Sequence, residues 1–179
     1  VFPGNVGMGK TTTALKLVRR GFKFLSDEVA SFHLGKRLLE PFHRTVNIRN
    51  GSPDLIGENV EGNGALKRKQ GIETFRTVDV ESIIPDSLSG ACEPKYLLFL
   101  QGFGEKTRLA PMSPSNALFR LIRFSHQPIT NPASLMYMLA PIVNELRCFS
   151  FIFGDTDEAT DRIVDLIADD PYGTTGATG

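Results

Sequence analysis

One run of residues constrains this chain more than any other. It is Gly4-Asn5-Val6-Gly7-Met8-Gly9-Lys10-Thr11, followed by Thr12. The run satisfies the pattern G-x-x-x-x-G-K-[ST], in which a glycine-rich turn leads from a strand into a helix. Glycines allow successive backbone N–H groups to turn inward around phosphate oxygens, and the helix directs its positive end at the same anion. The run therefore predicts a phosphate loop that binds a nucleoside triphosphate.

Two side chains of the run have specific roles in this chemistry. Lys10 is expected to reach the β- and γ-phosphates as a point charge, and the Thr11 hydroxyl is expected to ligate Mg²⁺. Residues 4–12 together form the predicted nucleotide-binding segment.

The residues around the run fit the strand–loop–helix context that the pattern requires. Ala14, Leu17 and Val18 have helical spacing, and Gly21 is a suitable end for that helix. Only Val1-Phe2-Pro3 precede the loop, so we expect a strand stub and further residues upstream of this chain.

Composition sets broad limits. With 179 residues, 41% of them hydrophobic and 22% charged, the chain is expected to form a single domain over residues 1–170. Twenty basic and twenty acidic residues balance, which gives no reason to expect a nucleic-acid or membrane surface. Cys92 and Cys148 are expected to be free thiols of a cytoplasmic protein.

An acidic pair follows the next predicted strand. Phe22-Lys23-Phe24-Leu25 is expected to be that strand, and Ser26-Asp27-Glu28 follows it. A strand, a crossover helix and a second strand of one sheet form a right-handed unit, which brings the second carboxyl end near the phosphate loop. Adjacent residues at a strand end point to opposite sides, so one carboxylate can hold the metal while the other faces a second substrate.

These features resemble the kinase domain of HPr kinase/phosphorylase and of the HPr-kinase-related kinases. The resemblance extends from the phosphate loop through the Leu25-Ser26-Asp27-Glu28 run to later segments. Those segments are Pro41-Phe42-His43-Arg44, Val46-Asn47-Ile48-Arg49 and Gly154-Asp155-Thr156-Asp157-Glu158-Ala159. The family's Glu-x-Arg-Gly-Leu-Gly signature is absent, and Glu28 stands where its usual acidic pair has a second Asp.

The resemblance implies a fold, a reaction and roles for individual residues. The fold would be an α/β phosphate-loop domain of three layers with a mixed central sheet, like HPr kinase and PEP carboxykinase. The reaction would be ATP- and Mg²⁺-dependent transfer of the γ-phosphate to a serine hydroxyl of a protein or peptide, in a homo-oligomer. By position, Asp27 would be the general base, Glu28 the Mg²⁺ ligand, and Arg108 a cation that neutralises the transferred phosphoryl group.

The remaining segments predict further elements. Residues 50–71 are rich in Gly and Asn and predict a long surface loop, and residues 96–100 predict a central strand. A helix is expected after Ser113, another over residues 133–146 that is kinked or divided at Pro141, and a third after a strand at residues 148–153. Residues 171–179 are expected to form a flexible tail.

Two other functions remain open at this stage. A phosphate-loop ATPase or GTPase switch would hydrolyse its nucleotide without an acceptor and would use Asp155, at the end of an apolar strand, as the metal ligand. A nucleotide-sensing module would bind the nucleotide with little catalysis. A small-molecule kinase is a weaker possibility.

Overall fold

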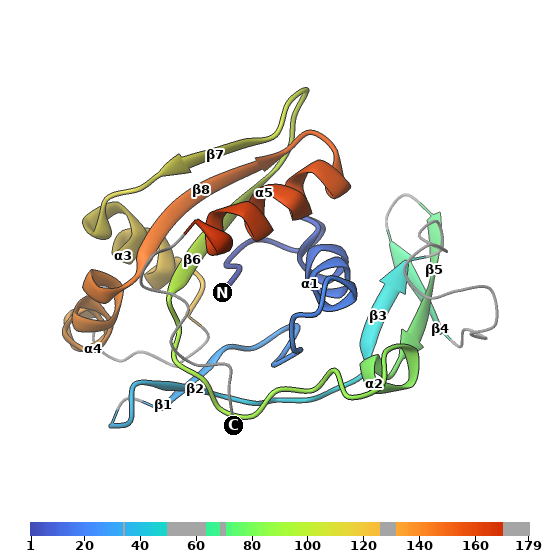
Figure 1. Ribbon diagram of the computed structural model, residues 1–179, viewed down its shortest axis with the longest axis horizontal. Helices are drawn as coiled ribbons and strands as arrows, with labels where there is room; N and C mark the ends of the chain where they lie inside the picture. Colours follow the sequence, from blue (N-terminus) through green and yellow to red (C-terminus); the bar gives the residue numbers. More distant parts are fainter. Residues whose placement is uncertain (34, 50–63, 69–70, 126–131, 170–179) are drawn as a thin grey trace.

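The computed structural model describes residues 1–33, 35–49, 64–68, 71–125 and 132–169. Its main sheet contains β6 (Tyr96–Phe103), β8 (Arg147–Phe153) and β7 (Arg108–Pro111), in the order β6-β8-β7. Strands β6 and β8 are parallel, and β7 is antiparallel to β8 (Figure 1). The predicted α/β architecture with a mixed sheet is therefore confirmed. The expected tail at residues 171–179 lies outside the described residues.

Residues 1–3 extend this sheet beyond β6. The amino group of Val1 donates to the Tyr96 carbonyl oxygen at 2.9 Å. The N–H groups of Leu98 and Leu100 donate to the carbonyl oxygens of Val1 and Pro3 at 2.9 and 3.0 Å. Val1 thus bonds to two residues that flank its position on β6, which is the pattern of parallel pairing. The phosphate loop consequently begins beside the carboxyl end of β6.

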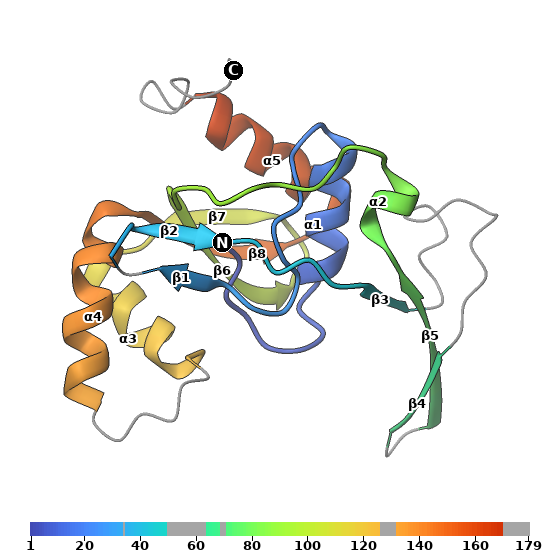
Figure 2. The ribbon, with the colours of Figure 1, turned by 90° about the horizontal axis from the view of Figure 1, so that it is seen from below.

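Alternating residues of β6 define three layers. Leu98 and Leu100 belong to a buried cluster with α1 (Lys10–Arg19) and α5 (Thr156–Ala168). Leu97 and Phe99 belong to another cluster with α3 (Pro114–Arg123) and α4 (Pro132–Glu145). Figure 2 shows α5 and α3 on opposite sides of the sheet. The helical residues in these clusters are Leu17, Ala159, Ile163, Ala117 and Val143.

A second, antiparallel sheet packs on another side of α1. It contains β3 (Val46–Arg49), β5 (Gly71–Val78) and β4 (Gly64–Arg68), in the order β3-β5-β4. Leu15 and Val18 of α1 are buried with residues of β3, β5 and α2 (Val80–Ile83). Strands β1 (Ser31–His33) and β2 (Leu38–Glu40) form a short antiparallel ladder, which lies between α1 and β3 in the sequence. Helix α1 therefore contributes to two separate cores.

Several predicted boundaries differ in the structure. The expected strand at residues 22–25 is reduced to one parallel bridge between Phe24 and Leu88, because only Phe24 pairs there. The expected loop over residues 50–71 is wrong for β4, which pairs along its length with β5, while residues 50–63 lie outside the described part. Pro141 lies inside α4 without dividing it. Among the described residues, no helix combines the length and apolarity needed to cross a bilayer.

Candidate functional site

The phosphate loop, residues 4–11, has the backbone that its glycines permit. Gly7 and Gly9 have φ angles of 84° and 80°, in the left-handed region that glycine adopts most readily. Gly9 is the N-cap of α1, no side chain caps this helix start, and its first turn contains no acidic residue. The positive end of α1 is therefore available to an anion.

The loop packs against the carboxyl ends of β6 and β8. A Cβ atom at Gly4 would lie 3.2 Å from the Leu100 Cβ, and one at Gly9 would lie 3.4 Å from the ring of Phe153. Gly102, with φ 114°, approaches the loop from the other direction: its Cβ position lies 3.3 Å from the Met8 sulfur. These close approaches fix the loop at the edge where α/β sheets bind ligands.

The Lys10 side chain turns back over the loop. Its ammonium donates to the carbonyl oxygens of Gly4 and Asn5 at 2.9 and 2.8 Å. Partial burial lowers the pKa of Lys10, while the negative charges of Asp27 and Glu28 act in the opposite direction. The ammonium thus lies within the loop, and its contact with phosphate oxygens stays a prediction.

The Thr11 hydroxyl contacts the first carboxylate of the acidic pair. Its oxygen lies 2.9 Å from both carboxylate oxygens of Asp27, to which it donates. Burial raises the pKa of Asp27, the Thr11 hydrogen bond lowers it, and the nearby charge of Glu28 raises it. The structure therefore brings the phosphate loop and the acidic pair together, although the strand expected to do so is only a bridge at Phe24.

Glu28 and the outer loop residues are more open to solvent. Glu28 is exposed, and its charge is felt by both Lys10 and Asp27. Val6 is 77% exposed at the loop, and Thr12 is half-buried. Glu28 therefore lies beside the Thr11–Asp27 pair with its carboxylate accessible.

This donor set suits Mg²⁺. Magnesium prefers oxygen ligands and in nucleotide sites is held by one or two carboxylates together with phosphates. Thr11 and Asp27 supply a hydroxyl and a carboxylate side by side. In the described part of the chain, no group of three or more His, Cys, Asp or Glu side chains is placed to hold a metal ion.

Asp155, the rival metal ligand, has a different role in the structure. It is the N-cap of α5, and its Oδ1 accepts from the backbone N–H groups of Asp157 and Glu158 at 2.8 and 3.0 Å. These hydrogen bonds lower the pKa of the Asp155 carboxyl. The carboxylate that reaches the Thr11 hydroxyl is Asp27.

Arg108 lies at the start of β7. It is exposed and pairs through its backbone register with Ile152 of β8. Among the described residues, its side chain makes no hydrogen bond or ion pair with the phosphate loop. Its role in neutralising a phosphoryl group stays a prediction.

The sequence did not reveal how the β6–β7 connection is held beside the loop. The Gly104 N–H donates to the Phe153 carbonyl oxygen at 2.6 Å, and the Thr107 hydroxyl donates to Glu158 at 2.7 Å. The Gly154 N–H donates to the Thr107 hydroxyl at 3.1 Å. A Cβ atom at Gly154 would lie 2.6 Å from the Thr107 nitrogen, a clash with backbone. The sequence signal for this packing is the set of glycines at 102, 104 and 154.

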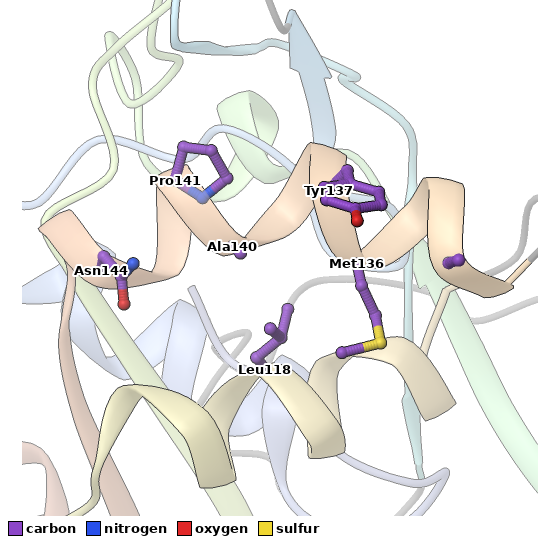
Figure 3. A pocket seen from close by; sticks show the side chains of 7 residues that line it. Leu118, Met136, Tyr137, Ala140, Pro141 and Asn144 are labelled. Carbon is purple, nitrogen blue, oxygen red and sulfur yellow. The ribbon is translucent and has the colours of Figure 1, made fainter.

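An apolar cavity of about 600 Å³ lies between α3 and α4 (Figure 3). Its lining includes Asn144 but no charged side chain, so it offers nothing to neutralise a triphosphate. The other lining residues are Leu118, Ala133, Met136, Tyr137, Ala140 and Pro141.

Comparison with known proteins gives one partial similarity. No protein-family model and no solved structure matches the chain. The chain is 36% identical over 104 residues to the signal recognition particle 54 kDa protein of Pyrococcus horikoshii. This match covers 53% of the chain and 21% of that protein, so the chain spans about a fifth of that relative's length.

Proposed function

We propose that this chain binds a Mg²⁺–nucleoside triphosphate at the phosphate loop and hydrolyses its γ-phosphate. The contact between the Thr11 hydroxyl and the Asp27 carboxylate carries this proposal, because it puts a carboxylate suited to Mg²⁺ beside a helix start suited to phosphates. The chain's partial similarity to a signal recognition particle protein also supports nucleotide binding at a phosphate loop. Nothing in the name of that protein indicates a kinase.

The chain's own residues would bind and align the triphosphate. The Lys10 ammonium would exchange its hydrogen bonds with the loop carbonyl oxygens for hydrogen bonds to the β- and γ-phosphates. Backbone N–H groups at the start of α1 would donate hydrogen bonds to the same anion. Thr11 and Asp27 would hold Mg²⁺. When bound, this ion neutralises charge on the transferred phosphoryl group. Alignment and charge neutralisation together account for most of the catalysis in phosphoryl transfer.

Asp27 and Glu28 would have different roles in the hydrolysis. Asp27 is engaged by Thr11 through both carboxylate oxygens, which suits a metal ligand. Glu28 is exposed next to it and would orient the attacking water and accept its proton. This division differs from the one that the HPr kinase resemblance implies.

Transfer of the γ-phosphate to a hydroxyl group is the second candidate function, and the raised pKa of Asp27 favours it. A carboxylate with a raised pKa is better suited to accept a proton from a serine hydroxyl. In this case the chain would be an HPr-kinase-like serine kinase with the fold of that family. Asp27 would be the base, Glu28 would ligate Mg²⁺, Arg108 would neutralise charge, and the protein would use ATP as a homo-oligomer.

One experiment separates these functions. The purified chain is incubated with γ-labelled ATP and Mg²⁺, first alone and then with cell lysate, with Lys10→Ala as the matched control. Hydrolysis predicts labelled inorganic phosphate from the chain alone, and this release is lost in Lys10→Ala. Label on a protein band that appears only with lysate and is lost in Lys10→Ala would replace hydrolysis by the kinase function. Tight nucleotide binding with negligible phosphate release would instead indicate a sensing module.

A further inference from the structure

Phe103, the last residue of β6, is a large apolar side chain that the core does not cover. It is 62% exposed, although it lies directly beside the phosphate loop. An atom of its ring lies 3.6 Å from the position of a Cβ atom at Gly9, and its ring centroid lies 5.7 Å from that of Phe153. One part of the ring is thus packed on the loop, while much of it faces solvent.

Phe103 and Asp27 lie on different sides of the α1 start. Gly9 is the N-cap of α1, and Thr11 lies two residues later in the first turn of the helix. Asp27 contacts the Thr11 side, whereas Phe103 contacts the Gly9 side. The cores agree with this placement: Phe24, near Asp27, is buried with α2 and the second sheet, and Phe153, near Phe103, is buried with α5 and the main sheet.

The backbone on both sides of Phe103 is held in place by its neighbours. The next residue, Gly104, donates its N–H to the Phe153 carbonyl oxygen. The preceding residue, Gly102, abuts the Met8 sulfur of the phosphate loop. The connection that follows is fixed to the start of α5 through Thr107 and Glu158. An exposed aromatic ring on a fixed backbone loses little freedom when a flat partner binds to it.

We propose that Phe103 stacks against the base of the nucleotide bound in the phosphate loop. This proposal rests on the proposed function. A triphosphate whose γ end is held on the Thr11–Asp27 side would extend across the start of α1 toward the Gly9 side, where the ring lies. Stacking uses the flat face that every base has and reads no hydrogen-bonding edge. The site therefore accepts ATP and GTP alike.

The test compares ligands with and without a base. Equilibrium binding of ATP, GTP and inorganic tripolyphosphate is measured by calorimetry in the presence of Mg²⁺. The proteins are the wild type, Phe103→Ala, Phe103→Tyr and Phe119→Ala. Phe119 is a matched control, because it is 67% exposed on α3, in a different layer from the loop. The chain contains no tryptophan, so Phe103→Trp adds a fluorescent reporter at this one position.

Phe103→Ala is expected to weaken ATP and GTP binding by the same factor, on the order of tenfold, with tripolyphosphate binding unchanged. Phe103→Tyr restores nucleotide binding, Phe119→Ala binds like the wild type, and Phe103→Trp fluorescence changes with ATP but not with tripolyphosphate. An equal loss for all three ligands would mean that Phe103 only supports the loop, and no loss would mean that it does not touch the base. Either result overturns the stacking proposal alone. A wild type that binds neither ATP nor tripolyphosphate would overturn the proposed function as well.

Discussion

The hydroxyl oxygen of Thr11 lies 2.9 Å from each carboxylate oxygen of Asp27, sixteen positions later in the chain. Thr11 is held by the start of α1, and Asp27 is held by the segment that pairs with Leu88 through Phe24. A hydroxyl oxygen and a carboxylate, held by separate segments of the chain, therefore meet at the positive end of a helix.

Replacing Lys10 by Ala should weaken nucleotide binding. The substitution deletes the one ammonium that the loop itself supplies, and its charged hydrogen bonds are expected to contribute a loss on the order of a hundredfold in ATP affinity. Calorimetry with Mg²⁺-ATP measures the loss, and Lys36→Ala, at an exposed turn, serves as the control. Retention of wild-type affinity by a folded Lys10→Ala protein would show that the loop does not bind the triphosphate.

Thr11 offers a substitution that keeps its shape. Thr11→Val preserves the volume but deletes the hydroxyl that donates to Asp27, whereas Thr11→Ser keeps the hydroxyl. The valine variant should need about tenfold more Mg²⁺ for half-maximal phosphate release, because metal sites depend strongly on such partners. The serine variant should behave like the wild type. Equal Mg²⁺ requirements for valine and serine would place the metal elsewhere.

Asp27 makes stability depend on pH. Because burial raises its pKa in the folded state, the folded chain holds this proton more tightly than the unfolded chain does. The free energy of unfolding should therefore fall as pH rises from the ordinary aspartate pKa of about 3.9 through the raised value. Urea denaturation across this range should show that decline in the wild type and a weaker one in Asp27→Asn.

The same variant should lose Mg²⁺-dependent turnover. Asparagine can still accept the Thr11 hydrogen bond but carries no charge for a metal, so the fold should be preserved while phosphate release stops. Identical pH dependence of stability in the two proteins would contradict the raised pKa. Normal turnover in Asp27→Asn would contradict its metal-binding role.

For Asp155 we expect a role in stability and none in metal binding. Its carboxylate caps α5 through two backbone N–H groups, so Asp155→Ala should lower Tm, whereas Asp155→Asn should keep the cap. Its lowered pKa stabilises the folded state above the ordinary aspartate pKa, and this contribution is lost as pH falls through the lowered value. Thermal melts at neutral and acidic pH measure both effects. A loss of Mg²⁺-ATP affinity in Asp155→Asn would restore Asp155 as the metal ligand.

The local elements of this fold were predictable because their signals are contained in short segments. The glycine pattern, the apolar spacing of Leu17 and Val18, and Gly21 predicted α1, which ends at Arg19. The apolar run at residues 96–100 predicted β6, and Ser113 predicted the cap of α3, where its side chain accepts from the Asn116 N–H.

Features that depend on distant partners were less accessible. Phe22-Lys23-Phe24-Leu25 has the composition of a strand, but it finds only one pairing residue, Leu88. Residues 64–68 look like a loop because they contain Gly64 and two cations, yet β5 pairs with all of them. The site divides in the same way: the loop and Asp27 were predicted, whereas the approach of Phe103 to Gly9 depends on packing that no local pattern encodes.

The Lys10 ammonium has a further consequence for which anions the loop can recruit. It already has two carbonyl oxygens as acceptors, on Gly4 and Asn5. An incoming ligand must offer this cation a better environment than two neutral dipoles provide. A polyphosphate with several adjacent negative charges can do so, whereas a singly charged anion competes poorly, so we expect the loop to select ligands by their charge.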